Sequence, residues 1–307
     1  MEMFLDILLD AALDTLKLLP FLFLTYWAME ALEHRAQRRS TALVRSAGRL
    51  GPLCGGLLGA FPQCGFSAAA SSLFAGRVIT LGTLVAIYLS TSDEMLPLML
   101  TRLSSSAATG GAASPGGPVL TLSKTILIVG AKAAIGIVSG FAVEAVRAVA
   151  RIERQPYEID RLCRDAHCRC EDGILVSAAR HTAKMALFIF LVTLALGGAF
   201  ALVGEDSLRR FATSAPMAGT FVVGLLGLIP NCAASVVITE LYLSGTIDFG
   251  SMMSGLLVSA GVGLLVLFRT NRKPLQNLGV VVLLYALGVV WGTLLQIAHF
   301  EAFLDRF

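Results

Sequence analysis

Two stretches of the chain decide the fold: FPQCGFSAAASSLF at residues 61–74 and IPNCAASVVITELY at residues 229–242. Each places a proline, a carboxamide and a cysteine in the middle of an apolar run. A shift of 168 residues (230 minus 62) aligns the two stretches without a gap. The pairs are Pro62 with Pro230, Cys64 with Cys232, Ser67 with Ser235, Leu73 with Leu241, Phe74 with Tyr242, Ile79 with Ile247, and Gly82 with Gly250. This similarity predicts an internal duplication.

The composition around these stretches is that of a membrane protein. Of the 307 residues, 56% are apolar and 15% charged, with a mean hydropathy of +0.76, whereas soluble domains carry about 25% charged residues. The charges cluster, and apolar stretches of about 20 residues separate the clusters, enough for a helix to cross the ~30 Å hydrocarbon core. The net charge of +3 gives no support to nucleic-acid binding, and six cysteines do not make a disulfide scaffold.

The chain divides into eight apolar segments, and we expect an all-α polytopic protein. The segments cover residues 4–33, 51–76, 78–100, 119–148, 174–203, 215–245, 247–268 and 278–300. The first opens with Glu2 and Asp6 instead of a basic region, so we interpret it as a retained membrane helix and not a removable signal peptide. Residues 104–118 are almost wholly Ser, Ala, Gly and Pro, which is typical of a loop.

The distribution of arginines predicts the topology. Loops 35–49, 147–172 and 269–273 are rich in Arg, which places them in the cytoplasm and the protein in the inner membrane as a multi-pass chain. This works if segments 51–76 and 215–245 each enter and leave on one side, as hairpins of two short helical arms. The two hairpins then enter from opposite sides. We therefore predict two inverted repeats, residues 1–149 and 174–307, joined by a linker at 150–173. Each repeat would have three spanning helices and one broken-helix hairpin, about ten helical segments in all.

The hairpin tips are the strongest candidate site. Inverted repeats with paired broken helices indicate a secondary transporter whose site lies near the bilayer midplane. The tips are Pro62, Gln63 and Cys64 in the first half and Pro230, Asn231 and Cys232 in the second, followed by Ser67 and Ser235. A helix N-terminus favours the thiolate form of cysteine, which soft metals and metalloids need. The alternative for each tip is a proline kink beside a small buried cysteine.

Three carboxylates are further candidates for binding a substrate or a coupling ion. Asp93 and Glu94 lie within an apolar segment, where an ionisable group is costly and by default functional. At most one of the two can face the pathway, with Asp93 a possible metal ligand, and both could instead lie at the outer boundary. Glu240, near the end of the second hairpin, follows the same logic. Lys124 and Lys132 could face the interior or extend toward the membrane surface, and the sequence leaves this open.

The linker holds a second set of possible metal ligands, Cys163, His167, Cys168 and Cys170. The spacing is not that of a zinc finger and no second cysteine pair follows. Capture of a soft metal and incidental loop residues are the two interpretations.

The runs at 61–97, 229–250 and 168–194 resemble the ten-helix heavy-metal exporter family, whose members are also labelled arsenic-efflux-like permeases or manganese transporters. The two hairpin motifs carry this resemblance, which extends over nearly the whole chain. Counting each hairpin as two helices turns the eight segments into ten, as the family name implies. The resemblance implies export of a metal and leaves the cargo open.

We therefore expect a proton-coupled exporter of a heavy metal or metalloid, without enzymatic activity or cofactor. Thiols at both tips favour an arsenical over manganese, which carboxylates would prefer. No Walker A sequence is present, so the chain itself does not hydrolyse ATP. The alternatives are a channel or organic-solute carrier on the same scaffold, and an intramembrane thiol redox protein. The sequence Gly136-x-x-x-Gly140 permits close helix packing, within one protomer or in a homo-oligomer.

Overall fold

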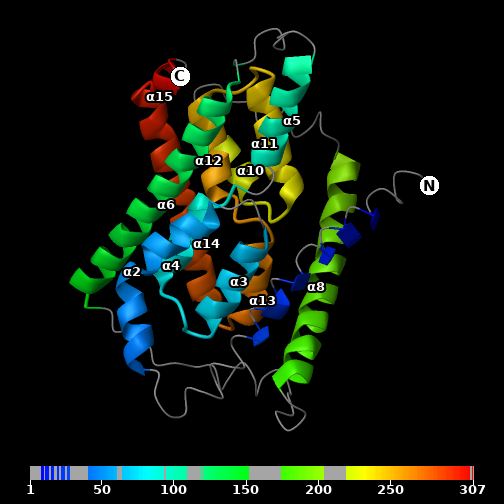
Figure 1. Ribbon diagram of the computed structural model, residues 1–307, viewed down its shortest axis with the longest axis vertical. Coiled ribbons are helices and arrows are strands. Elements are labelled where there is room, and N and C mark those ends of the chain that lie inside the picture. The colour runs from blue at the N-terminus through cyan, green and yellow to red at the C-terminus, as the bar shows by residue number, and fades with distance from the viewer. Residues whose placement is uncertain are drawn as a thin grey trace.

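A computed structural model of the chain shows a bundle of helices (Figure 1). It describes residues 8–9, 11–13, 15–16, 19–20, 22–24, 26–27, 41–60, 64–92, 95–108, 118, 120–151, 174–203, 219–304 and 306. For residues 41–49, 64, 104–108, 174, 177, 181, 196–197, 199–203 and 232 it describes the main chain only. All regular structure in this described part is helical, which confirms the all-α class.

In the described part of the first half there are five labelled helices. They are α2 (Thr41–Gly59), α3 (Cys64–Ala75), α4 (Leu81–Ser90), α5 (Met95–Ala108) and α6 (Leu122–Val149). The described residues between 8 and 27 are also helical. The expected interruption of segment 51–76 is present, since α2 ends at Gly59 and α3 begins at Cys64.

In the described part of the second half there are seven labelled helices. They are α8 (Ile174–Val203), α10 (Gly219–Gly227), α11 (Cys232–Leu243), α12 (Phe249–Val258), α13 (Val262–Thr270), α14 (Pro274–Ile297) and α15 (Phe300–Leu304). The prediction for segment 174–203 matches α8 residue for residue. The interruption expected in segment 215–245 falls between α10 and α11.

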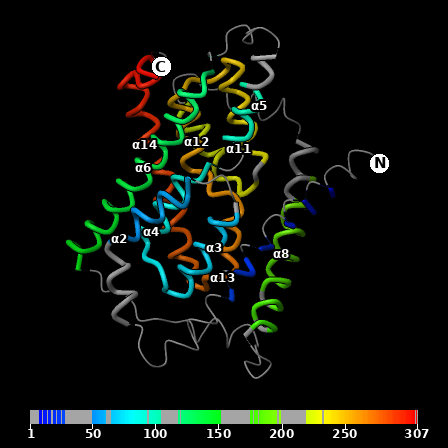
Figure 2. Tube along the Cα trace, in the orientation of Figure 1, coloured from blue at the N-terminus to red at the C-terminus, as the bar shows by residue number. Residues whose placement is uncertain are grey.

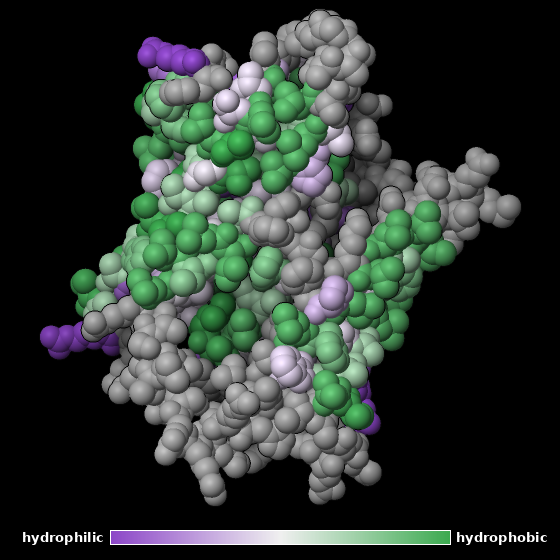
Figure 3. All heavy atoms as spheres, in the orientation of Figure 1, coloured by the Kyte–Doolittle hydropathy of each residue, from purple (hydrophilic) through white to green (hydrophobic). Residues whose placement is uncertain are grey.

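Among the residues that the structure describes, four helical stretches are long and apolar enough to cross a membrane, which fits a membrane protein. These are Leu122–Val149, Ala178–Ala195, Phe249–Thr270 and Pro274–Ile297. Large apolar side chains remain exposed on them, for example Ile126 on α6 and Val282 on α14. In Figure 3 the described part of the visible face is mostly apolar, and the hydrophilic atoms lie mainly toward its edges. Such a surface suits lipid contact better than water.

Two predictions of uninterrupted helices are wrong. Segment 78–100 is broken between α4 and α5, and where α4 ends the hydroxyls of Ser90 and Thr91 donate to the carbonyl oxygens of Ala86 and Ile87, both at 2.7 Å. Thr91 then leaves the helix with φ −57° and ψ 127°. Serine and threonine hydroxyls offer the backbone alternatives to the helical hydrogen bond. Segment 247–268 is broken between α12 and α13, where Gly261 has φ 50°, a conformation that glycine adopts at little cost.

Two predicted loops are shorter than expected. Residues 41–49, assigned to the first arginine-rich loop, form the start of α2, and residues 104–108 form the end of α5. Arginine and alanine are good helix formers, so neither basic residues nor an alanine-containing run ends a helix by itself. The helix predicted from residue 278 begins four residues earlier, at Pro274, and proline is favoured in the first turn of a helix.

The same close helix crossings occur within each of the two halves. A Cβ on Gly82 of α4 would lie 2.4 Å from the carbonyl oxygen of Gly140 of α6, and one on Gly250 of α12 would lie 2.7 Å from that of Gly292 of α14. Gly82 and Gly250 are 168 residues apart, whereas Gly140 and Gly292 are 152 apart, because the first half has the longer connection before its last helix. A further crossing follows the same shifts: Gly136 faces the carbonyl oxygen of Ala86, and Gly288 that of Ser254.

The turns after α3 and α11 are also equivalent. Arg77 and Gly245, 168 residues apart, have φ of 62° and 70°. In the first turn the N–H of residue 78 donates to the carbonyl oxygen of residue 73 at 2.8 Å. In the second, residues 246 and 241 make the same bond at 2.9 Å. A side-chain cap follows three residues later in each, from Thr80 to α4 and from Asp248 to α12.

The two halves are interleaved. Helix α3 of the first half packs against α13 of the second, and α5 of the first packs against α11 of the second. The 168-residue shift relates α3 to α11 and α5 to α13. The two pairs are therefore equivalent, with the halves exchanged. In Figure 2 the pair α3 and α13 lies in the lower part of the molecule and the pair α5 and α11 in the upper part.

Candidate functional site

The two hairpin tips begin the equivalent helices α3 and α11. Cys64 and Cys232 are the first residues of these helices, so each thiol-bearing residue occupies a helix N-terminus. Asn231 precedes Cys232 as the helix cap: it is buried, and its side-chain oxygen accepts from the N–H of Ala233 at 3.3 Å. Pro230 is half-buried beside it. Pro62 and Gln63 lie outside the described residues, as do the side chains of both cysteines.

The serines after the tips are buried, and their main-chain carbonyl oxygens accept hydrogen bonds within their own helices. The carbonyl oxygen of Ser67 accepts from the hydroxyl of Ser71, and that of Ser235 from Thr239, both at 2.7 Å. Ser71 also contacts the hydroxyl of Tyr88 and the carbonyl oxygen of Gly263, both at 2.7 Å. These contacts join α3 to α4 and α13.

The carboxylates have different outcomes. Asp93 and Glu94 lie outside the described residues. Glu240 forms an ion pair with Arg102, with 2.6 Å between Oε2 and Nη2. Both side chains are partly exposed, and the pair joins α11 to α5.

A buried polar region surrounds the helix breaks. Ser90, Thr91 and Ser92 are all buried where α4 ends. On the second half, Ser259 is buried where α12 ends. Non-helical backbone at membrane depth is tolerated only inside protein or along a wet cavity, and the burial of these residues meets the first condition.

Lys132 on α6 is a charged residue that reaches this region. Its ammonium donates to the carbonyl oxygen of Thr91 at 2.5 Å and to that of Leu256 at 3.1 Å. Lys124 is equally buried, so both lysines that the sequence left open face the interior. A lysine within an apolar span was the sequence signal that singled out Lys132. Its hydrogen-bond partners are main-chain oxygens of distant segments, which leave no pattern in the sequence.

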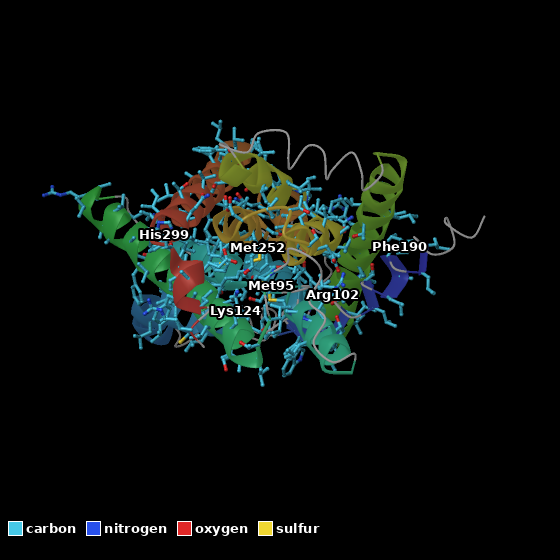
Figure 4. All side chains as sticks on the ribbon, turned by 90° about the horizontal axis from the view of Figure 1, so that it is seen from above. Met95, Arg102, Lys124, Phe190, Met252 and His299 are labelled. Atoms are coloured by element: carbon cyan, nitrogen blue, oxygen red, sulfur yellow. The ribbon has the colours of Figure 1, made fainter. Side chains whose placement is uncertain are left out.

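Four buried methionines of the described residues belong to one hydrophobic core cluster. Met95 and Met99 lie on α5, and Met252 and Met253 on α12. Seen from above, Met95 and Met252 lie toward the centre of the molecule, whereas Arg102 lies nearer the side of α8 (Figure 4). Thioethers are soft and polarizable, and they also fill irregular gaps in cores.

Within the part of the chain that the structure describes, no three His, Cys, Asp or Glu residues gather as metal ligands would. Cys163, His167, Cys168 and Cys170 lie outside that part. Comparisons of the chain with family models, with curated proteins and with solved structures find no match.

Proposed function

We propose that the chain is a secondary-active membrane transporter that exports a heavy metal or metalloid. The observation that carries the proposal is the recurrence of the same glycine crossings and positive-φ turn in two halves whose helices break at equivalent places, α4 at Thr91 and α12 at Ser259. Paired broken helices related by an inverted repeat are typical of secondary transporters. The resemblance to the ten-helix heavy-metal exporter family points the same way.

The repeats are inverted in this proposal, with three spanning helices and one hairpin in each. The exchange of partners between α3–α13 and α5–α11, in the lower and upper parts of the molecule, supports the inversion (Figures 1 and 2). A rocking or sliding of one half against the other around a central site would then expose that site to each side in turn.

The cargo is a soft species in the favoured version, bound by the thiols of Cys64 and Cys232 with the carboxamides of Gln63 and Asn231. The equivalent placement of both cysteines at helix N-termini supports it, because that position favours the thiolate. The alternative cargo is Mn²⁺, bound by oxygen ligands that include Asp93 or Glu94. A channel or an organic-solute carrier would use the same scaffold and would need neither the thiols and carboxamides nor the carboxylates.

Metal accumulation in cells that lack their own exporters tests the proposal. Cells with and without the protein are loaded with arsenite, methylated trivalent arsenic or manganese, and each test is repeated with Cys64→Ser/Cys232→Ser and with Asp93→Asn. We expect a lower arsenical content that depends on both cysteines. A lower manganese content that survives the cysteine change but not Asp93→Asn selects the alternative cargo. Unchanged contents of every species contradict metal export.

A further inference from the structure

The joint between α3 and α13 is close and polar. A Cβ on Gly263 of α13 would lie 2.8 Å from the Cβ of Ser67 and 3.0 Å from its carbonyl oxygen, so the two backbones touch there. Ser71, one turn after Ser67, places its hydroxyl 2.7 Å from the carbonyl oxygen of Gly263. Ser71 and Gly263 belong to different halves of the chain, and both are buried. A buried hydrogen bond therefore ties the halves together where α3 crosses α13.

The hydroxyl of Ser71 has three polar neighbours and one hydrogen. It lies 2.7 Å from the carbonyl oxygens of Ser67 and Gly263, and 2.7 Å from the hydroxyl of Tyr88 on α4. The hydrogen of Ser71 serves the two carbonyl oxygens, so the hydroxyl of Tyr88 is the donor toward Ser71. If α3 and α13 separate, Ser71 keeps its bond to Ser67 inside its own helix. The bond to Gly263 can therefore break and re-form reversibly, and we call Ser71, Tyr88 and Gly263 the α3–α13 latch.

The equivalent joint between α11 and α5 lacks these groups. The 168-residue shift relates Ser71 to Thr239, Tyr88 to Leu256 and Gly263 to Met95. The hydroxyl of Thr239 donates to the carbonyl oxygen of Ser235 within α11, at 2.7 Å. Leu256 has no hydroxyl, and Met95 carries a side chain where Gly263 has none. The α5 and α11 backbones thus cannot touch as those of α3 and α13 do.

The two joints also differ in burial. Ser72 on α3 is fully buried, whereas its equivalent Glu240 on α11 is 30% exposed and pairs with Arg102, which is 48% exposed. Val266 on α13 is fully buried, and its equivalent Leu98 on α5 is partly exposed. Charged side chains that remain exposed in a membrane protein need water around them. The α5–α11 joint is therefore hydrated, and the α3–α13 joint is dry.

Equivalent positions of an inverted repeat lie at matching depths from opposite sides of the membrane. The difference in burial is therefore a difference in the state of the two joints. In the proposed topology the α3–α13 joint lies toward the cytoplasm, because α13 leads into the arginine-rich turn at 269–273. The α5–α11 joint lies toward the outside, because α5 leads into the loop that ends at residue 118. In Figure 2 the two joints occupy the lower and upper parts of the molecule.

We propose that the α3–α13 latch holds the empty transporter closed on its cytoplasmic side. Ser71 is a positioning residue: it sets how often α3 and α13 separate. Cargo from the cytoplasm enters after this separation, and it leaves after the latch has re-formed and the α5–α11 joint has opened. Because the outer joint has no latch, the empty molecule favours the state that is closed toward the cytoplasm. For its sides and its cargo this inference rests on the proposed function, but the difference between the two joints does not.

Two substitutions on different helices weaken the latch. Ser71→Ala removes the bond between the halves and leaves the carbonyl oxygen of Gly263 buried without it, but only in the closed state. Gly263→Ala pushes α13 away from Ser67 and leaves α3 unchanged. Thr239→Val is the matched control, because it removes the equivalent hydroxyl, whose bond stays within α11. The usual net contribution of one hydrogen bond corresponds to roughly a 2- to 10-fold change in the population of the open state.

Cysteine labelling measures the two joints without any cargo. Ser72→Cys reports on α3 and Val236→Cys, partly exposed, on α11. Each is introduced alone into a chain without its native cysteines and labelled in lipid nanodiscs with a small water-soluble thiol reagent. We expect Ser72→Cys to react more slowly than Val236→Cys. Ser71→Ala should accelerate labelling of Ser72→Cys by roughly 2- to 10-fold without accelerating Val236→Cys, and Gly263→Ala should do the same from the other helix.

Three results overturn the proposal. The first is an unchanged labelling rate of Ser72→Cys in Ser71→Ala and Gly263→Ala. The second is an equal acceleration at both reporters, which would show that the substitutions loosen the whole fold. The third is an equal acceleration of Ser72→Cys by Thr239→Val, which would show that any lost hydroxyl has this effect.

Uptake into inside-out vesicles connects the latch to transport, with arsenite and Mn²⁺ as probes and an acidic interior. A ligand that binds only the open state has an apparent affinity reduced by the fraction of molecules in that state. Ser71→Ala should therefore lower the half-saturating probe concentration by roughly 2- to 10-fold, and Thr239→Val should not. An unchanged value in Ser71→Ala contradicts a role of the latch in loading. If the wild type takes up neither probe, the proposed function fails, while the labelling still decides whether the latch exists.

Discussion

At the scale of single residues, the turns after α3 and α11 have the same backbone conformation but different side chains. Both need a residue with positive φ; the second turn has Gly245 and the first has Arg77. The left-handed conformation costs a residue with a Cβ about 1–2 kcal/mol relative to glycine. The Nε of Arg77 is also buried, without a hydrogen-bond partner among the described residues. The first turn is therefore the less stable copy.

Arg77→Gly should stabilise the protein by about 1 kcal/mol. The change removes the left-handed strain and the unpaired Nε. Glycine also raises the conformational entropy of the unfolded chain, which cancels part of this stabilisation. The apparent melting temperature in detergent should rise. Gly245→Ala is the matched change in the second turn and should lower it. A fall for Arg77→Gly would show that the arginine side chain contributes more than its backbone costs.

At the scale of helices, the glycine crossings determine how closely α4 approaches α6 and α12 approaches α14. Each Cβ added at Gly82 or Gly250 would meet a backbone oxygen, which cannot move aside as a flexible side chain can. Small residues at helix crossings let backbones approach in membranes, where burial of apolar surface from lipid contributes little. The tight approach of α6 also brings Lys132 within reach of the ends of α4 and α12.

Gly82→Ala and Gly250→Ala should each destabilise the protein by about 1–3 kcal/mol, the usual cost of overpacking. Gly130→Ala, on the α6 helix against which Gly82 packs, has no atom within 4 Å of the added Cβ; it is the control and should be tolerated. Thermal unfolding in detergent measures all three. Equal tolerance of all three changes would mean that α4 and α12 are not held at these distances.

The ion pair between α5 and α11 gives a prediction about Glu240. A partly exposed pair of this kind is worth about 0–1 kcal/mol, so Glu240→Gln and Arg102→Gln should change stability little, and a double-mutant cycle should give a small coupling energy. A loss of metal export in Glu240→Gln without a loss in Arg102→Gln would assign the carboxylate to the cargo pathway. Equal losses would assign it to the joint between the helices.

At the scale of the whole molecule, the sequence predicted the helices but not every break. The sequence predicted α8 and the interruptions at both tips, because segment length, hydropathy and a proline within an apolar run are local signals. It missed the breaks at Thr91 and Gly261, since an apolar run looks the same whether its helix continues or turns. The partners of Lys132 could not be predicted from the sequence either, because Leu256 lies 124 residues away and contributes a main-chain oxygen.

The central claim is that the two halves are inverted, and the side of the membrane on which equivalent turns lie tests it most directly. Val78→Cys and Thr246→Cys, 168 residues apart in the turns after α3 and α11, are introduced one at a time into a chain without its native cysteines. A membrane-impermeant maleimide is then applied to intact cells and to inside-out vesicles. We predict that Thr246→Cys reacts only from outside and Val78→Cys only from the cytoplasmic side. Reaction of both from the same side would contradict the inverted repeat and the transport mechanism that depends on it.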